Sequence, residues 1–427
     1  MRIGVGQVDI TPLPGGELCG FAARTQPSQG VLDPLFAKAI YLTDAGRRLL
    51  WVHCDLIGFD ASIVTAFRRW VLSQLGLTNA EVMLSATHTH SGPGTIHLEE
   101  AGAYDATYVE FLQERLHSAA KLAVMRTEEC SLVTADGHLD LAVDRRKKPS
   151  SHTDPRVGGV GFRRADGTFI AAILNYAIHP VALGPSNRAV SADLMGRAAD
   201  SLSERLPGNP LVLATNGACG NLDPPALDVS ARQLAVWGPQ IADAVAPSLV
   251  AAPAVAGATF STATRLTPLP LEVLDPVALS ALTESALNRG PSTGAWRLKY
   301  RGVVEHWRDA LLAAWHGGKT LHHREAELFA INLGGVAFLG INAEVFSRFA
   351  EWVRHTAGRP IYVVSYANGD MGYLPTREAY LEGGYEVEDA HFFYGGYRFQ
   401  AGALEQLASS AADLLCNPPS PSPLPMH

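Results

Sequence analysis

The sequence predicts a mixed α/β fold, and three observations lead to this prediction. Short runs rich in β-branched and aromatic residues alternate along the chain with segments whose apolar residues recur at helical spacing. Several neighbouring β-rich runs are joined by glycine-containing turns, which is typical of hairpins. The chain has 427 residues, of which 47% are hydrophobic and 18% charged, so it is long enough to bury a large core.

The expected elements follow one another along the whole chain. Strands are expected over residues 2–9, 37–42, 49–56, 81–84, 131–143, 158–162, 169–177, 211–215, 258–265, 327–333, 336–341 and 361–365. Helices are expected over residues 60–75, 108–124, 228–250, 277–287, 296–315 and about 396–415, together with one beginning near Ser191 or Asp193 and one from Glu344 to about His355.

The domain organisation is expected to be simple. Residues 1–416 are predicted to form a single domain, and the helical block at about 275–320 resembles an insertion into it. Residues 417–427 are rich in Pro and Ser, which predicts a disordered tail.

Composition excludes several classes of partner. A net charge of −8 and a pI near 6.0 argue against nucleic acid, and the basic run Arg145–Lys148 is too short to suggest it. No apolar stretch is long enough for a signal peptide or a transmembrane helix, so we expect a cytoplasmic protein. The five cysteines contain no CxxC pair and are expected to be reduced core residues.

The motif Thr87–Gly94, whose sequence is THTHSGPG, carries the clearest chemical signal. It follows the predicted strand 81–84, and residues two apart in an extended backbone point the same way, so His88 and His90 can converge. Neutral imidazole is a common metal ligand, and the pair suits two ligands or one ligand and one acid/base group. The same pair is also consistent with two polar residues in a turn.

Other candidates lie at the ends of later predicted strands. His179 follows the strand 169–177, and the glycine-rich loop 216–225 offers backbone donors for a substrate oxygen. Glu344 is either a ligand or an acid favoured in the first turn of a helix. The loop 366–386 is dense in Tyr, Gly, Asn and Asp, which suits contact with a substrate.

Together these motifs resemble the catalytic domain of the neutral/alkaline ceramidases, zinc amidohydrolases that cleave the amide of N-acylsphingosine. The resemblance covers nearly the whole chain and rests on seven pieces: Asp9–Pro12, Thr87–Gly94, Ala177–Pro180, Gly220–Pro224, Ala343-Glu344, Tyr373–Arg377 and Tyr385. It implies antiparallel-rich central sheets flanked by helices.

The resemblance also implies roles for individual residues. One Zn²⁺ per chain would be held by His88, His179, Glu344 and Tyr373. His90 and Tyr385 would flank the scissile amide, and the family arginine maps onto Arg145 or, alternatively, Arg146. Two imidazoles and a carboxylate leave zinc Lewis acidic enough to activate water. Asp55 or Asp193 is expected to orient the imidazoles.

Two departures from the family pattern bear on the substrate. Larger members carry a further β-sandwich domain and are usually secreted or membrane-associated, whereas this sequence stops after the catalytic part. Asp223 stands where the ceramidases have serine. A carboxylate facing the cleft is costly to desolvate against long acyl chains, so we expect a small polar N-acyl amide as the substrate. Alternatively, Asp223 points away and caps the turn that follows.

Two other functions are also consistent with the sequence. A dinuclear metallophosphoesterase would also place His, Asp and Asn at strand ends, and Asn368-Gly369-Asp370 fits that pattern, although too few bridging ligands are evident for two metals. A metal-stabilised binding protein without turnover would keep the ligands, but it would not need acid/base groups beside them.

Overall fold

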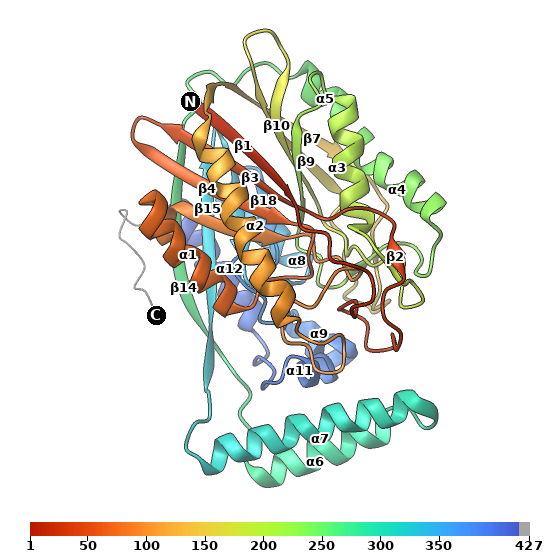
Figure 1. Cartoon of the computed structure of the whole chain (residues 1–427). Helices are drawn as coiled ribbons and strands as arrows, with labels where there is room; N and C mark the ends of the chain where they lie inside the picture. The colour runs from red at the N-terminus through yellow and green to blue at the C-terminus, as the bar shows by residue number, and fades with distance from the viewer. Residues whose placement is uncertain (418–427) are drawn as a thin grey trace.

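The computed structural model describes residues 1–417, apart from the side chains of residues 294 and 295. Its longer strands form three sheets, and most of its helices lie outside these sheets (Figure 1). Antiparallel pairs outnumber parallel pairs in every one of the three. The predicted mixed α/β class with antiparallel-rich sheets flanked by helices is therefore confirmed. The predicted tail lies almost wholly outside the described residues, and the single-domain organisation stays a prediction.

The three sheets share one arrangement of four strands. Within each, three strands pair antiparallel in succession, and a fourth pairs in parallel with the third after a helical crossover. The first set is β1 (Arg2–Asp9), β3 (Phe36–Asp44), β4 (Arg47–Cys54) and β5 (Val82–Ala86). The second is β7 (Ser131–His138), β9 (Arg156–Arg163), β10 (Phe169–Tyr176) and β12 (Leu211–Asn216). The third is β14 (Phe260–Pro270), β15 (His323–Leu333), β16 (Val336–Ile341) and β18 (Ile361–Val364).

Local sequence explains the hairpins and crossovers of these sets. The β3–β4 turn contains Ala45 and Gly46, and the β15–β16 turn contains Gly334 and Gly335, all with positive φ as two-residue hairpin turns require. The crossover helices are α1 (Ala61–Leu75), α3 (Asp193–Arg205) and α8 (Arg348–Ala357). Helix α1 begins where the Asp60 carboxylate accepts from the Ser62 backbone N–H.

Buried apolar side chains from all three sheets meet in one cluster that includes Trp51, Phe162, Phe329 and Phe338. Trp51 and Phe338 contact edge to face with their ring centroids 5.3 Å apart. Burying each such side chain stabilises the fold by about 1.5–3 kcal/mol. Two larger clusters fill the space between the sheets and the outer helices, which include α2 (Ala106–Met125), α4 (Ala231–Asp243), α5 (Ala246–Ala251) and α12 (Ala403–Cys416).

Three predicted helices differ from the structure. The helix expected over 228–250 is divided into α4 and α5, because Pro247 lacks an N–H and its ring would clash with the carbonyl four residues earlier. The helix expected from Glu344 begins only at Arg348, and Glu344 lies instead in the short strand β17 (Glu344–Val345). The last helix begins at Ala403, after the short helices α9 (Arg377–Glu382), α10 (Tyr385–Glu388) and α11 (Ala390–Phe393).

The predicted helical block forms a hairpin of α6 (Pro276–Arg289) and α7 (Gly294–His316), which lies beneath the sheets and beside α11 in Figure 1. Trp307 fixes α7 by donating its indole N–H to the Gly396 carbonyl at 2.9 Å. No helix among residues 1–417 combines the length and apolarity needed to cross a membrane. The cytoplasmic location stays a prediction, and of the five cysteines only Cys19, Cys54 and Cys219 are buried.

Candidate functional site

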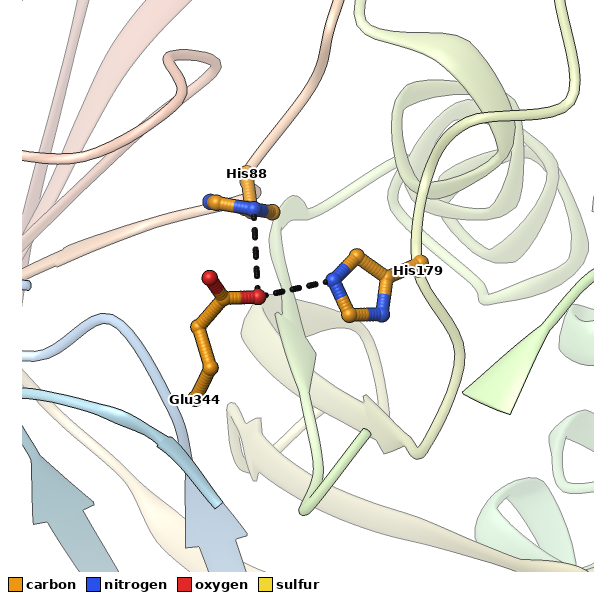
Figure 2. Close-up of side chains that lie close together, drawn as sticks. All are labelled: His88, His179 and Glu344. Atoms are coloured by element: carbon orange, nitrogen blue, oxygen red, sulfur yellow. Dashed lines mark hydrogen bonds and ion pairs between the residues drawn. The ribbon is translucent and has the colours of Figure 1, made fainter. Parts of the chain in front are cut away.

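Three of the predicted ligands come together from three different sheets. His88 lies two residues after β5, His179 lies three residues after β10, and Glu344 lies three residues after β16. Figure 2 shows the two imidazoles turned toward one carboxylate. Because each residue follows the end of a strand, the rigid sheets fix where the three side chains meet.

The three side chains form a compact and buried group. One potential ligand atom from each lies within 4.8 Å of the others. His179 Nε2 is 2.9 Å from Glu344 Oε2, and His88 Nε2 is 3.6 Å from the same oxygen. None of the three residues is more than 2% exposed. Within residues 1–417 this is the only such group of three or more His, Cys, Asp or Glu side chains.

Backbone carbonyls orient both imidazoles. His88 Nδ1 lies 2.6 Å from the Ile57 carbonyl, and His179 Nδ1 lies 2.7 Å from the Cys219 carbonyl. The expectation that Asp55 or Asp193 would do this is wrong, because the recorded hydrogen bonds of both carboxylates are to backbone N–H groups. These carboxylates shape the neighbouring loops instead.

The donor set fits a metal cation. Carbonyl oxygens only accept, so both imidazoles donate from Nδ1, and both Nε2 atoms are turned toward one carboxylate oxygen. Such an arrangement needs a positive charge between the groups. Burial lowers the pKa of His88 to about 4, so this imidazole is neutral near pH 7 as a metal ligand must be. Burial opposes the ionisation of Glu344, but His88 and the hydrogen bond with His179 lower its pKa to about 2. Burial also opposes the charged form of His179, but Cys219 and Glu344 raise its pKa to about 10, so a proton on this imidazole supplies the positive charge that a bound cation would replace.

The fourth predicted ligand, Tyr373, is brought beside this group by a short ladder. Its strand β19 (Tyr373–Leu374) pairs in parallel with β17, so that Tyr373 is opposite Glu344. The Tyr373 ring also lies under the Arg145 guanidinium, 5.5 Å from its centre. Tyr373 lines the same cavity as His88 and Glu344.

Two tyrosines that sequence reasoning missed contact the ligand group directly. Tyr366 stacks on His88 with ring centroids 3.8 Å apart, and its hydroxyl is 3.2 Å from His179 Nε2 and 3.3 Å from Glu344 Oε2. The Tyr394 hydroxyl donates to Glu344 Oε1 at 2.5 Å and to Asp370 at 3.2 Å. The density of Tyr after residue 365 was a signal for the first, but no local pattern marked Tyr394.

The backbone is held in an unusual conformation at this centre. His88 and Tyr366 both have positive φ, at 62° and 58°. Left-handed backbone costs about 1 kcal/mol or more in residues other than glycine, and it persists where the surrounding structure enforces it. The stacked pair therefore lies on two strained positions, as is common at functional sites.

His90 lies beside the ligands and is held from the other side by the loop before β2 (Gly30–Val31). Both of its ring nitrogens are shielded from solvent and have no partner among the described residues. Phe21 packs edge-on against the ring at 4.8 Å, and Arg24 donates to the His90 carbonyl at 2.9 Å. Burial lowers the pKa of His90 well below its usual value. The ring is therefore neutral, and its nitrogens have no hydrogen-bond partner among the described residues.

A cavity of about 540 Å³ opens from the ligand group, which is within the usual size range for a small-molecule site. The predicted residues His90, Tyr385, Arg145 and Asp223 all contribute to its lining. Its remaining walls are mostly apolar and aromatic, and they include Phe21, Leu98, Trp296, Tyr300 and Phe393. The histidines, the charged pair and the aromatic wall therefore share one space.

The geometry distinguishes Arg145 from Arg146. Arg145 donates to Asp223 at 3.1 Å and to Glu386 at 2.7 Å, and it lines the cavity. Arg146 donates to the other oxygen of Glu386 at 2.7 Å and to the Gly383 carbonyl at 2.7 Å, and it does not line the cavity. Asp223 faces the cavity and is neutralised there by Arg145.

Comparisons with known proteins point to one family. Residues 1–145 match the family model described as neutral/alkaline non-lysosomal ceramidase, N-terminal. A neutral ceramidase of Pseudomonas aeruginosa is 28% identical over an alignment of 226 positions, which covers 46% of this chain and 32% of that protein. A neutral ceramidase of Drosophila melanogaster is 25% identical over an alignment of 242 positions, which covers 49% of this chain and 33% of that protein. The matched region thus spans about a third of either relative's length.

Solved structures show the same fold. The crystal structure of the neutral ceramidase from Pseudomonas aeruginosa superimposes with a TM-score of 0.73 at 19% identity, over 99% of this chain and 76% of that one. A structure described as ceramidase complexed with C2 gives a TM-score of 0.74 at 19% identity, over 97% and 74%. The resemblance inferred from the motifs is therefore confirmed: the chain is related to the neutral/alkaline non-lysosomal ceramidases through its first 145 residues, and its described part has the neutral ceramidase fold.

Proposed function

We propose that this chain is a zinc-dependent hydrolase that cleaves the amide bond of an N-acyl compound. The observation that carries the proposal is the buried group of His88, His179 and Glu344, which opens into a cavity also lined by the unpartnered His90. A structural zinc site is closed by four protein ligands, whereas a catalytic site keeps a position open. The relation to neutral ceramidases supports the same reaction class.

Different residues around the cavity would bind the zinc, transfer protons and stabilise the substrate oxygen. His88, His179 and Glu344, with Tyr373 beside them, would hold the zinc, which supplies a Lewis acid that polarises a carbonyl and activates water. His90 is placed to exchange a proton with the reacting groups, because its nitrogens are neutral and free of protein partners. Tyr385 offers a hydroxyl from the cavity wall, and Arg145 offers a fixed positive charge to a substrate oxygen.

We infer that the substrate is a small polar amide rather than membrane ceramide. Asp223 and Arg145 form an ion pair in the cavity lining, where it is only partly exposed. Covering both charges with two long alkyl chains would remove the remaining water from them without supplying hydrogen bonds. A hydroxylated or charged group would replace that water.

Metal analysis and an amide screen test the proposal. The purified full chain should hold one zinc, and His88→Ala and His179→Ala should each lose it while the circular dichroism spectrum stays that of the wild type. Short-chain ceramide and soluble N-acyl amines and amino acids would be assayed side by side. Full zinc in both variants would refute the ligand assignment, and two zinc ions per chain would favour a phosphoesterase. Turnover of ceramide alone would refute the polar substrate.

A further inference from the structure

The lining of the cavity includes a second group of polar residues that the proposed reaction does not use. Besides the ligand group, its lining includes Arg289 from the end of α6, Tyr300 from α7 and Asp389 from the start of α11. The helical hairpin, which lies beneath the sheets in Figure 1, therefore contributes side chains to the wall of the candidate active site. Nothing in the proposed amide cleavage explains a guanidinium in this position.

An aromatic surface also contributes to the walls of the cavity. Trp296 stacks on Phe393 with ring centroids 6.4 Å apart and planes inclined by 8°, and Phe393 contacts Tyr385 at 6.2 Å. This surface runs from a residue predicted to flank the scissile bond to the hairpin that carries Arg289. A short carbon chain attached to the amide can lie along it with favourable contacts.

The hydrogen bonds of Arg289, Tyr300 and Asp389 leave several N–H groups of the Arg289 guanidinium without an acceptor in the described part of the chain. Asp389 accepts from the Tyr300 hydroxyl at 2.8 Å, and it forms an ion pair with Arg289 Nη2 at 3.8 Å, which is too long for a hydrogen bond. Among the residues that the structure describes, Arg289 donates one hydrogen bond, from Nη1 to Ser285 Oγ at 2.9 Å. A guanidinium has five N–H groups, so several remain for a ligand, and it presents them in a fork that matches a carboxylate.

We propose that Arg289 forms a distal subsite that selects amides carrying a carboxylate at the end remote from the scissile bond. This rests on the proposed amidohydrolase function and narrows its substrate class to N-acyl compounds with a terminal anion. The reactive amide lies by the ligand group, the connecting chain lies on the aromatic surface, and the carboxylate accepts hydrogen bonds from Arg289.

Matched compounds test the subsite. Two series of monoamides of increasing chain length would carry the free carboxylate on the acyl side or on the amine side, each paired with the neutral carboxamide of equal size. At the best length, kcat/KM should favour the carboxylate by about tenfold. Arg289→Gln should bring this ratio close to one, and Arg289→Lys should retain part of it. An unchanged ratio in Arg289→Gln would overturn the proposal.

Two controls separate this inference from the proposed function. Arg301→Gln removes the same charge from α7, where Arg301 is exposed, pairs with Glu305 and does not line the cavity; it should keep the wild-type ratio. Calorimetric binding of the same compounds gives a readout without turnover. If no amide is cleaved, the proposed function fails. The subsite is then supported if wild type, but not Arg289→Gln, binds the carboxylates more tightly than the carboxamides, and it is refuted if both proteins bind the two kinds of compound equally.

Discussion

At the scale of single residues, Gly20 shows how closely the candidate site is packed. A Cβ atom built on Gly20 would lie 2.4 Å from Cγ of the His90 ring, and the residue has φ +110°. Any larger side chain must displace the imidazole or the loop. A displacement of about 1 Å in a reacting group can cost 10²-fold in rate.

Gly20→Ala is therefore expected to lower kcat on the preferred amide by tenfold or more with zinc content unchanged, because the three atoms nearest to the added Cβ all belong to His90. The matched control is Gly15→Ala. Gly15 has the same φ of +110° in the same loop, but no atom lies within 4 Å of its added Cβ. In the control, the substitution introduces backbone strain but no clash with a neighbouring atom. Equal losses of kcat in both variants would therefore show that backbone strain, and not displacement of the His90 ring, lowers the rate.

His53 provides a pH-dependent test away from the ligands. It is fully buried, with Nδ1 2.9 Å from Ser85 Oγ and Nε2 2.9 Å from the Ala214 carbonyl. Burial, together with nearby Lys38, lowers its pKa to about 3. In the unfolded chain His53 takes up a proton as the pH falls through about 6.5, whereas in the folded chain it stays neutral until much lower pH. The contribution of His53 to folding stability is therefore fully present above about pH 6.5 and decreases as the pH falls below that value.

Wild type should therefore lose stability relative to His53→Gln as the pH falls from 7 to 5.5, by about 1 kcal/mol. Urea unfolding of both proteins at several pH values measures the difference in their free energies of unfolding. Subtracting the value of the variant removes the contributions of all other titrating groups, which the two proteins share. A difference that is independent of pH across this range would contradict the lowered pKa of His53.

Sequence reasoning located the ligand candidates better than their surroundings. His88, His179 and Glu344 converge because they follow strand ends, which hydrophobic runs reveal. Tyr366 and Tyr394 could not be assigned, because their contacts depend on how separate segments pack in three dimensions. The carbonyls of Ile57 and Cys219 that orient the imidazoles could not be predicted either, because every residue has a carbonyl and only the folded structure shows which one faces the ring.

At the scale of elements, Trp307 is one of the buried side chains that anchor the α6–α7 hairpin. Trp307 is 1% exposed, and its N–H to the Gly396 carbonyl links α7 to the chain after α11. Trp307→Phe would keep most of the apolar contact but leave a buried carbonyl unsatisfied, which costs about 1–3 kcal/mol. Faster amide exchange in α7 and a lower melting temperature are expected.

The control for this anchor lies on the same helix. Trp315 is 39% exposed, so Trp315→Phe should change exchange and melting little. Similar behaviour of both variants would mean that the indole hydrogen bond does not hold the hairpin. If Trp307→Phe also weakens the preference for anionic amides, the position of α7 and the distal subsite are coupled.

At the scale of the whole molecule, the three four-stranded sets place their functional loops in corresponding positions. His88 follows β5 by two residues and Tyr366 follows β18 by two, and these are the stacked residues with positive φ. His179 and Glu344 each lie three residues after the third strand of their own set. Hairpins could be predicted from turn residues, but the parallel pairing of the fourth strand joins segments separated by a helix and leaves no local signal.

A cation at this centre would tie the three sets together, so metal removal should destabilise the molecule as a whole. At free zinc 100 times its dissociation constant, binding stabilises the fold by about 2.7 kcal/mol if the unfolded chain does not bind. Dialysis against a chelator should lower the melting temperature, zinc should restore it, and magnesium should not, because imidazoles favour zinc. Glu344→Gln should weaken the response and His88→Ala should abolish it, while His138→Ala, an exposed site remote from the centre, should respond as wild type does. An equal zinc response in His88→Ala and wild type would mean that zinc stabilises the protein at some other place, and the link between the three sheets through one metal would fail.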